Sequence, residues 1–180
     1  MRRLPGRGHL LPDAGPPPGG GHRALRELRP AAGGRLIKTL RVFTDGAARG
    51  NPGPAGLGVV IEDDQEMRLA GFHQYVGTAT NNEAEYQALI TGLQKAAEWK
   101  PDRLELYLDS QLVVEQLNRR YRVKKAELLP LFRRAQDLLA GFPEVTVTHV
   151  ERARNRGADA LANRGIDEWL ARRKESSPRG

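Results

Sequence analysis

Three short strand-like runs follow one another directly in the sequence, and this order constrains the fold more than any other feature. The runs are LRVFTD (40–45), LGVVIED (57–63) and RLAGFHQYV (68–76), which are rich in apolar and β-branched residues. The connections between them are short and contain Gly or acidic residues, as in ARGNPGPAG (48–56). Connections this short join antiparallel neighbours, so this half of the chain predicts an antiparallel meander.

Helical and strand-like patterns alternate in the rest of the chain. Four segments have the character of helices: 82–98, 110–118, 127–142 and 157–173. Two more runs, RLELYLD (103–109) and EVTVTHV (144–150), have the character of strands. The order βββ-α-β-α-α-β-α predicts an α/β protein with a five-stranded mixed sheet. Three antiparallel strands are followed by parallel crossover strands, and helices flank the sheet.

Residues 1–38 differ in composition from the remainder. They hold eight Lys or Arg and two Asp or Glu, which is +6 of the total net charge of +7, together with six of the 12 Pro and eight of the 20 Gly. Such a segment cannot bury enough apolar area to offset its chain entropy. We therefore expect a disordered basic tail over 1–38, a folded domain over 39–174 and a flexible C-terminus over 175–180. The tail is open to three interpretations: a solubilising segment, a wrongly assigned translation start, or a weak electrostatic tether to nucleic acid.

Several classes of protein are excluded by residue types that the chain lacks. It contains no Cys, which rules out disulfides, zinc–thiolate sites and Cys nucleophiles. No apolar run approaches the roughly 20 residues that span a bilayer, and no segment has the apolar stretch of a signal peptide. We expect a soluble, cytoplasmic, monomeric protein. The folded part is nearly neutral overall, so net charge alone does not predict nucleic-acid binding.

Four carboxylates fall where strands or helices would hold them rigidly: Asp45, Glu85, Asp109 and Asp159. Each has an ordinary alternative role, as a turn residue, a helix N-terminal acid or an N-cap. Isolated buried carboxylates are disfavoured and are usually paired, hydrogen-bonded or bound to metal. Two divalent ions about 3.5–4 Å apart can hold the attacking and leaving oxygens of a phosphoryl transfer, and Mg²⁺ prefers oxygen ligands. Together the four predict a site for such cations.

The helix over 82–98 bears on the assignment of Glu85. We expect Asn82 to be its N-cap, which makes Glu85 the third helical residue. Glu85 then shares a face with Leu89 and Gly92, and this face is expected to meet the sheet. Glu83 is the better candidate for a solvated acid.

At these residues the sequence resembles type 1 ribonuclease H over about 41–168. Four segments carry the resemblance: FTDGAARGNPGPAG (43–56), TNNEAEY (80–86), LYLDSQ (106–111) and NRGADALAN (155–163). The resemblance implies the ribonuclease H-like fold. It implies an endonuclease that hydrolyses the RNA strand of RNA–DNA hybrids with two Mg²⁺ or Mn²⁺ ions and leaves 5′-phosphomonoesters. It also implies that Asp45, Glu85, Asp109 and Asp159 are the catalytic and metal-binding residues.

The same resemblance implies contacts with the substrate. Asn51, Asn81, Asn82 and Gln111 match positions that line the minor groove of the hybrid. That groove is wide and shows the 2′-hydroxyls that distinguish RNA from DNA, and amide side chains can both donate and accept there. Asn81 and Asn82 also suit capping and turns, and the two roles can coexist. Thr80 is expected to cap a helix rather than to bind phosphate.

Two departures from the family pattern stand out. Many members carry a His in the loop that precedes the last Asp, but the matching loop ERARNRG (151–157) has none. We expect His149 to pack or hydrogen-bond on its strand. Product release is then open to two interpretations: Arg152 or Arg154 helps the product to leave, or water suffices.

The second departure is the missing basic handle, which makes the chain resemble the compact archaeal-like branch of the family. A basic cluster is still present and is either a phosphate contact or a solvated face: Arg119, Arg120, Arg122, Lys124 and Lys125. Some members of that branch also cut duplex RNA, so a nuclease of relaxed specificity is one alternative. A non-catalytic nucleic-acid-binding module is another, although such a module would have no need for all four acids.

Overall fold

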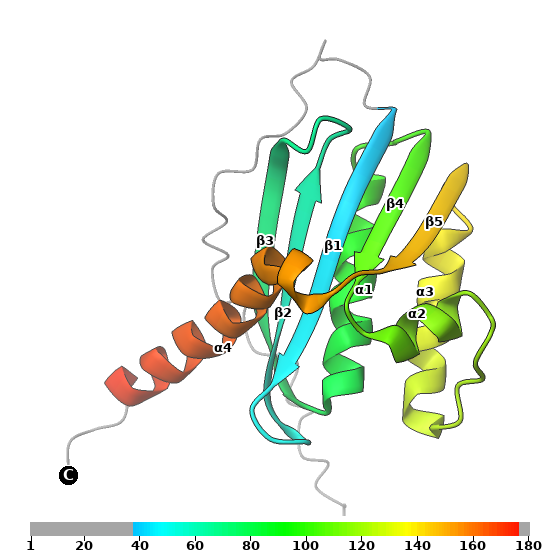
Figure 1. Ribbon diagram of the computed structural model, residues 1–180. Helices are drawn as coiled ribbons and strands as arrows, with labels where there is room; N and C mark the ends of the chain where they lie inside the picture. Colours follow the sequence, from blue (N-terminus) through cyan, green and yellow to red (C-terminus); the bar gives the residue numbers. More distant parts are fainter. Residues whose placement is uncertain (1–37, 177–180) are drawn as a thin grey trace, which may run out of the picture.

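The computed structural model describes residues 38–176, in which five strands form one mixed sheet with helices on both faces (Figure 1). The strands are β1 (Thr39–Ala48), β2 (Gly53–Glu62), β3 (Arg68–Ala79), β4 (Arg103–Leu108) and β5 (Glu144–His149). The α-helices are α1 (Asn81–Ala97), α2 (Gln111–Leu117), α3 (Leu129–Leu139) and α4 (Arg156–Ser176). Two 3₁₀ turns are η1 (Ala126–Leu128) and η2 (Arg152–Arg154). Within this part of the chain, no helix is both long and apolar enough to cross a membrane.

The strand order β3-β2-β1-β4-β5 confirms the predicted sheet. β1 pairs with β2, and β2 with β3, in antiparallel fashion, whereas β1–β4 and β4–β5 are parallel. The parallel strands return by way of α1 and α3, as crossover connections require. The carboxyl end of β4 therefore lies beside Thr44 of β1, and ligands of such sheets gather at the carboxyl ends of their strands.

The boundaries differ from the prediction at several ends. β1 runs on to Ala48 because its Gly-Ala-Ala end still pairs with β2, so Asp45 lies inside the strand and not at its end. The last helix continues to Ser176, beyond its predicted end at 173. Apart from Lys38, the predicted basic tail lies outside the described residues, as do 177–180.

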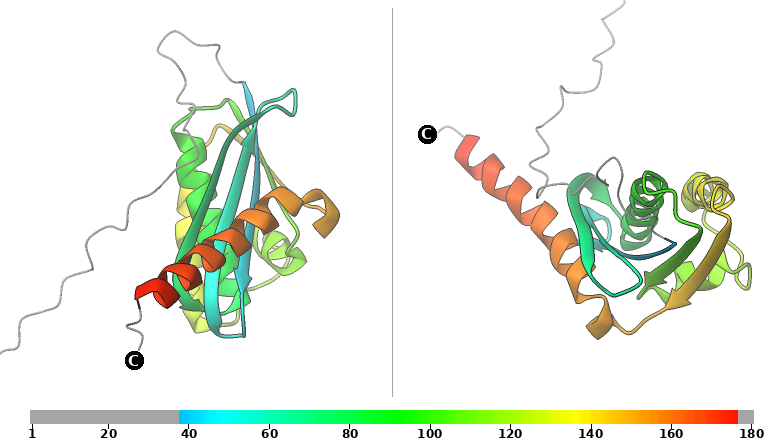
Figure 2. Two further views of the ribbon diagram at one scale, coloured as in Figure 1. Left: turned by 90° about the vertical axis from the view of Figure 1, so that its left-hand side faces the viewer. Right: turned by 90° about the horizontal axis from the view of Figure 1, so that it is seen from above.

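The main core lies between the sheet and the helices α1 and α3, which cover the same face (Figure 2). Leu104, Leu106 and Leu108 of β4 are fully buried there, as their alternation predicts. Leu89 of α1 is also fully buried, and Gly92 lets α1 approach β1, where an added methyl would meet Thr44. The predicted face of this helix therefore meets the sheet.

The opposite face is only half covered, because α4 crosses β2, β3 and part of β1 (Figures 1 and 2). α4 sits directly on two glycines of β2. A methyl added at Gly56 would collide with Ala162, and one at Gly58 with Ala158. The small residues thus set how closely α4, which carries Asp159, approaches the sheet.

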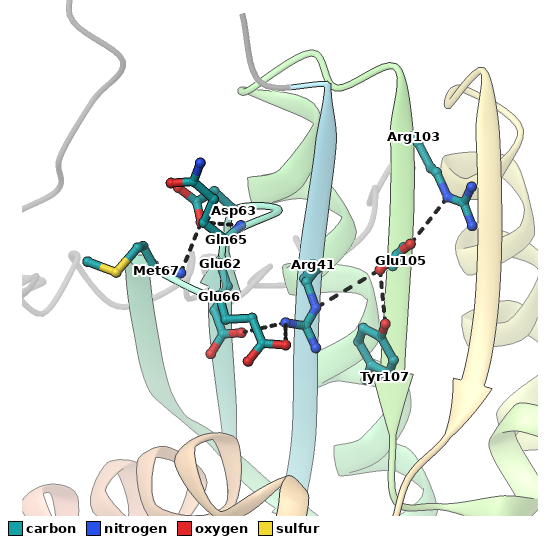
Figure 3. A network of polar contacts seen from close by, with 9 residues as sticks. All are labelled: Arg41, Glu62, Asp63, Gln65, Glu66, Met67, Arg103, Glu105 and Tyr107. Atoms are coloured by element: carbon teal, nitrogen blue, oxygen red, sulfur yellow. Dashed lines mark hydrogen bonds and ion pairs between the residues drawn. The ribbon is translucent and has the colours of Figure 1, made fainter. Parts of the chain in front are cut away.

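An ion-pair network occupies the half of this face that α4 leaves open (Figure 3). At its centre is the buried Arg41 of β1, whose guanidinium contacts the rings of Phe43 and Tyr107 at 5.6 and 5.3 Å from their centroids. Arg41 pairs with Glu66 at 2.7 Å and reaches Glu105 at 4.0 Å. The network therefore links β1 to β4 and to the β2–β3 turn without a covering helix.

Candidate active site

Three acidic side chains converge where the parallel pairing of β1 with β4 ends. Asp45 comes from β1, Glu85 from α1, and Asp109 from the residue directly after β4; one oxygen of each lies within 4.8 Å of the others. Asp45 is 5% exposed and Glu85 9% exposed, while Asp109 is half-buried. The structure thus brings three of the four predicted carboxylates into a single cluster.

Gly46 allows β1 and α1 to approach closely enough for this contact. A methyl group at Gly46 would collide with the backbone of Ala84 and Glu85. The backbone of Gly46 also hydrogen-bonds the carboxyl group of Glu85. The glycine that follows Asp45 is therefore part of what places Glu85 beside it.

The start of α1 corrects the prediction for this helix. Thr80, not Asn82, is the N-cap, and Glu83 occupies the third position of a capping box. The Glu83 carboxylate accepts from the backbone N–H of Thr80 at 2.7 Å, and this bond, with a second from the Thr80 hydroxyl, lowers the pKa of Glu83. Glu83 is a half-buried capping residue rather than a solvated acid. Glu85, two residues further on, points to a different side of the helix, toward the sheet.

The segment between β5 and α4 holds the end of β4. The backbone N–H of Val150 donates to the carbonyl of Leu108 at 2.9 Å. A ring nitrogen of His149 lies 3.2 Å from the carbonyl oxygen of Asp109, which agrees with the expected hydrogen bond of this histidine. Ser110, rather than Asp109, caps α2. The carboxylate of Asp109 is thus not used as a helix cap.

The fourth predicted carboxylate, Asp159, adjoins the cluster from α4. It is near enough to Asp45 to contribute to raising the pKa of Asp45, and its Oδ1 accepts a bond of 2.8 Å from the Arg152 guanidinium. The side chain of Asp159 is 28% exposed, and that of Arg152 is 77% exposed. Asp159 therefore faces solvent more than Asp45 does, and it is already paired with a cation of the chain.

Burial and mutual repulsion disfavour negative charge in the cluster. Burial, followed by the charges of Asp109 and Asp159, raises the pKa of Asp45 to about 8. Burial, followed by the charges of Asp45 and Asp109, raises the pKa of Glu85 well above its ordinary value. The buried Oε2 of Glu85 has no hydrogen-bond partner in the described part of the chain. A divalent cation would relieve both the repulsion and this missing partner, so the donor set fits a hard cation.

Two of the predicted substrate-binding residues are bonded to each other beside this site. The Asn51 Oδ1 accepts from the backbone N–H of Asn81 at 3.1 Å, and the Asn81 Oδ1 accepts from the backbone N–H of Ala48 at 3.1 Å. Because both amide oxygens accept from the backbone, each side chain keeps its NH₂ group for other partners. Both residues are exposed. Two outward-facing amide donors therefore lie next to the start of α1.

The other two predicted substrate contacts lie in the first turns of α1 and α2. Asn82 is half-buried in the first turn of α1, and Gln111 is the exposed first residue of α2. Lys125 of the basic cluster is close enough to Glu83 for its charge to contribute to lowering the pKa of Glu83. At least one member of the basic cluster is therefore near the first turn of α1.

One residue that sequence patterns did not single out contacts this region. Asn155 is 1% exposed, and its Nδ2 donates to the carbonyl of Thr44, the residue before Asp45, at 2.9 Å. Its place one helical turn before Asp159 was visible in the sequence. Its burial was not, because a polar residue before a helix is ordinarily a surface cap.

Known proteins resemble the chain over most of the described residues. The family model described as "Reverse transcriptase-like" matches residues 43–165. Ribonuclease HI of Halobacterium salinarum is 43% identical over 141 residues, which cover 78% of this chain and 69% of that protein. A bifunctional protein of Mycobacterium tuberculosis is 46% identical over 127 residues, which cover 70% of this chain and only 35% of that protein. The solved structure of LC11-RNase H1 in complex with an RNA/DNA hybrid is 38% identical, with a TM-score of 0.69 and coverage of 73% of this chain and 99% of that one.

Proposed function

Because the chain belongs to the ribonuclease H family, we propose that it is an endonuclease that hydrolyses the RNA strand of RNA–DNA hybrids with the help of divalent cations. The observation that carries this proposal is the convergence of Asp45, Glu85 and Asp109 within 4.8 Å. Support also comes from the relative that was solved with an RNA/DNA hybrid. The expected products end in 5′-phosphates.

The carboxylates of Asp45, Glu85, Asp109 and Asp159 would hold two Mg²⁺ or Mn²⁺ ions. When bound, such ions supply the positive charge that activates an attacking water and stabilises the leaving 3′ oxygen. Asp45 and Glu85 are buried on a strand and a helix, so they present their oxygens in a fixed geometry. Asp109 and Asp159 are more open and lie toward the solvent from which the substrate approaches.

The neighbouring amides would orient the hybrid. Asn51 and Asn81 are locked by their backbone contacts, so their NH₂ groups are preorganised as donors to the minor groove. Gln111 and Asn82 extend this polar surface from the first turns of α2 and α1. Contacts that discriminate RNA from DNA must involve 2′-hydroxyls, and short fixed amides suit them.

Arg152 would take over the part that a loop histidine has in many relatives. Its guanidinium is bonded to Asp159 but is largely exposed, so it can exchange this carboxylate for a phosphate of the product. The exchange would help the cleaved strand to leave the acidic cluster.

One comparison tests the proposed function. The purified chain is incubated with end-labelled RNA–DNA hybrid, duplex RNA and duplex DNA, each with Mg²⁺, Mn²⁺ or a chelator. We expect cleavage of the RNA strand of the hybrid with either metal and none with the chelator. Equal cleavage of duplex RNA would favour the alternative of relaxed specificity. Binding of the hybrid without any cleavage would instead favour a non-catalytic module.

A further inference from the structure

We propose that Asn155 is a positioning residue that ties β1, at Thr44, to the start of α4 and thereby sets the spacing of Asp45 and Asp159. This role rests on the proposed function, since it concerns the same carboxylates. Asn155 does not itself belong to the acidic cluster, and its effect would pass through the backbone of its neighbours.

Asn155 is buried and its amide is oriented by a single bond. The Nδ2 donates to the carbonyl of Thr44 at 2.9 Å, although the two residues are 111 positions apart in the sequence. The acceptor is a carbonyl, so the amide must present its NH₂ group to it. Thr44 is the last residue of β1 in register with β4, opposite Leu108. The side chain of Asn155 therefore bonds β1 at the point where the pairing of β1 with β4 ends.

Through its backbone neighbours, Asn155 is connected to two of the carboxylate residues. On one side, Thr44 directly precedes Asp45. On the other side, the carbonyl of Asn155 accepts from the backbone N–H of Asp159 at 3.0 Å, one turn into α4. The same residue thus binds the strand that carries Asp45 and the helix that carries Asp159. Because this strand and this helix carry the two carboxylates, a displacement of Asn155 would change the separation of Asp45 and Asp159.

The surrounding segment is attached to β4 by separate bonds. Val150 donates to Leu108, and His149 bonds the carbonyl of Asp109. Asn155 supplies the corresponding attachment to β1. Its Oδ1 has no hydrogen-bond partner among residues 38–176. Removal of the side chain would therefore break one bond to the protein and leave the attachment to β4 in place.

A purely structural role is the alternative, and the two roles differ in what they change. A structural residue would lower the melting temperature and leave the folded protein equally active. A positioning residue would lower the turnover and the cation affinity of protein that is fully folded. Changes to residues that orient metal-binding side chains typically reduce metal affinity or activity by about 10–100-fold.

The test compares the full chain with its Asn155→Ala and Asn155→Leu variants; the second has a similarly branched but larger side chain and lacks the donor. Asn118→Ala is the matched control, because the Asn118 amide also donates to a strand carbonyl, that of Val147 at 3.3 Å, but on the outer strand β5. Circular dichroism first establishes a temperature at which every protein is folded. At that temperature kcat and KM are measured on the hybrid, and Mn²⁺ affinity is measured by titration calorimetry without substrate.

We expect kcat to fall by roughly 10–100-fold and Mn²⁺ binding to weaken in both Asn155 variants, with KM within about threefold of the parent. The Asn118 variant should keep all three values. A lower melting temperature with unchanged kcat and Mn²⁺ affinity would overturn the positioning role, as would equal losses in the control. If the parent protein cleaves no hybrid, the proposed function fails, while the Mn²⁺ titration still decides the role of Asn155.

Discussion

The guanidinium of Arg152 donates a hydrogen bond of 2.8 Å to Asp159, so an exposed cation of the chain lies against the acidic cluster. The contact raises the pKa of Arg152 above its ordinary value, mainly through that hydrogen bond. Arg152 therefore keeps its charge at any working pH. The pair is open to solvent on one side and can part without burying a lone charge.

Arg152→Ala is expected to slow product release more than bond cleavage. Multiple-turnover rates on the hybrid should fall about tenfold, which corresponds to about 1.4 kcal/mol, while single-turnover rates fall less. Rapid-quench kinetics under both regimes provide the measurement. Arg156→Ala, at an exposed position in the same segment, is the control. Equal losses in the two regimes would contradict a role in release.

Asp45→Asn and Asp109→Asn should each abolish cleavage. Both changes keep the shape of the side chain and remove a charge that the cations need, so we expect losses of at least roughly 10²–10³-fold. Hybrid affinity, measured by fluorescence anisotropy in chelator, should stay within about threefold of the parent. Parent-like turnover in either variant would exclude its carboxylate from the metal site.

The stability of the metal-free protein should fall as the pH rises. The pKa of Asp45 is about 8 in the folded protein, against 3.8 in its ordinary state, and burial is the main cause. Between these values the folded state binds more protons than the unfolded state, so stability decreases across roughly pH 4 to 8. Asp45→Asn removes the group and should raise the melting temperature in chelator at pH 8 by at least about 2–4 °C.

Added Mg²⁺ should act in the opposite direction, and more strongly on the parent than on the Asp45→Asn variant. It stabilises the ionised carboxylates, so the parent should regain stability at pH 8 and the Asp45→Asn variant should gain less. Melting curves at several pH values, with chelator and with Mg²⁺, measure both effects. Stability that rises with pH in chelator would refute the repulsion described for the cluster.

Gly46→Ala should separate β1 from α1 at the site. The added methyl would meet the backbone of Ala84 and Glu85, which cannot move aside as a flexible side chain does. We expect a loss of at least about 2 kcal/mol in the free energy of unfolding and a loss of the Mn²⁺-dependent rise in melting temperature. Urea denaturation and thermal melts measure these effects. Gly141→Ala, in the turn before β5, should show neither.

The basic cluster should contribute to affinity by neutralising phosphates of the hybrid. Replacing Arg119, Arg120, Lys124 and Lys125 by Gln should flatten the dependence of log Kd on log salt, by about 0.7–0.9 for each phosphate that is no longer neutralised. Arg133 and Arg134, exposed on α3, provide a control pair. If the salt dependence of log Kd is unchanged in the quadruple variant, the cluster does not contact phosphates and is a solvated face.

Strand β4 was predictable because its period-two sequence pattern matches its alternating burial. Leu104, Leu106 and Leu108 alternate with polar residues, and only one register buries all three. The end of β1 was not predictable, because Gly46 and the alanines after it have low strand propensity. They extend the strand because β2 offers them backbone partners.

The candidate site was likewise predictable only in part. The motifs around the four carboxylates were specific enough to predict that these residues lie near one another. The structure brings Asp45, Glu85 and Asp109 together. The expectation that Thr80 caps a helix was confirmed, whereas the choice of Asn82 as the N-cap of α1 was wrong. Both are good caps, and their sequence does not choose between them. Asn155 was missed because its partner is a backbone carbonyl, and no side-chain pattern in the sequence records that bond.

The ion pairs around Arg41 have a consequence for how a polyanion can approach. Glu62, Glu66 and Glu105 ring this arginine on the part of the sheet that no helix shields. Arg41 and Arg103, which pairs with Glu105, are both already engaged with carboxylates, so this surface offers little free positive charge to a phosphate backbone. We therefore expect a duplex bound at the proposed active site to approach from the side on which Asp45 lies rather than along this flank.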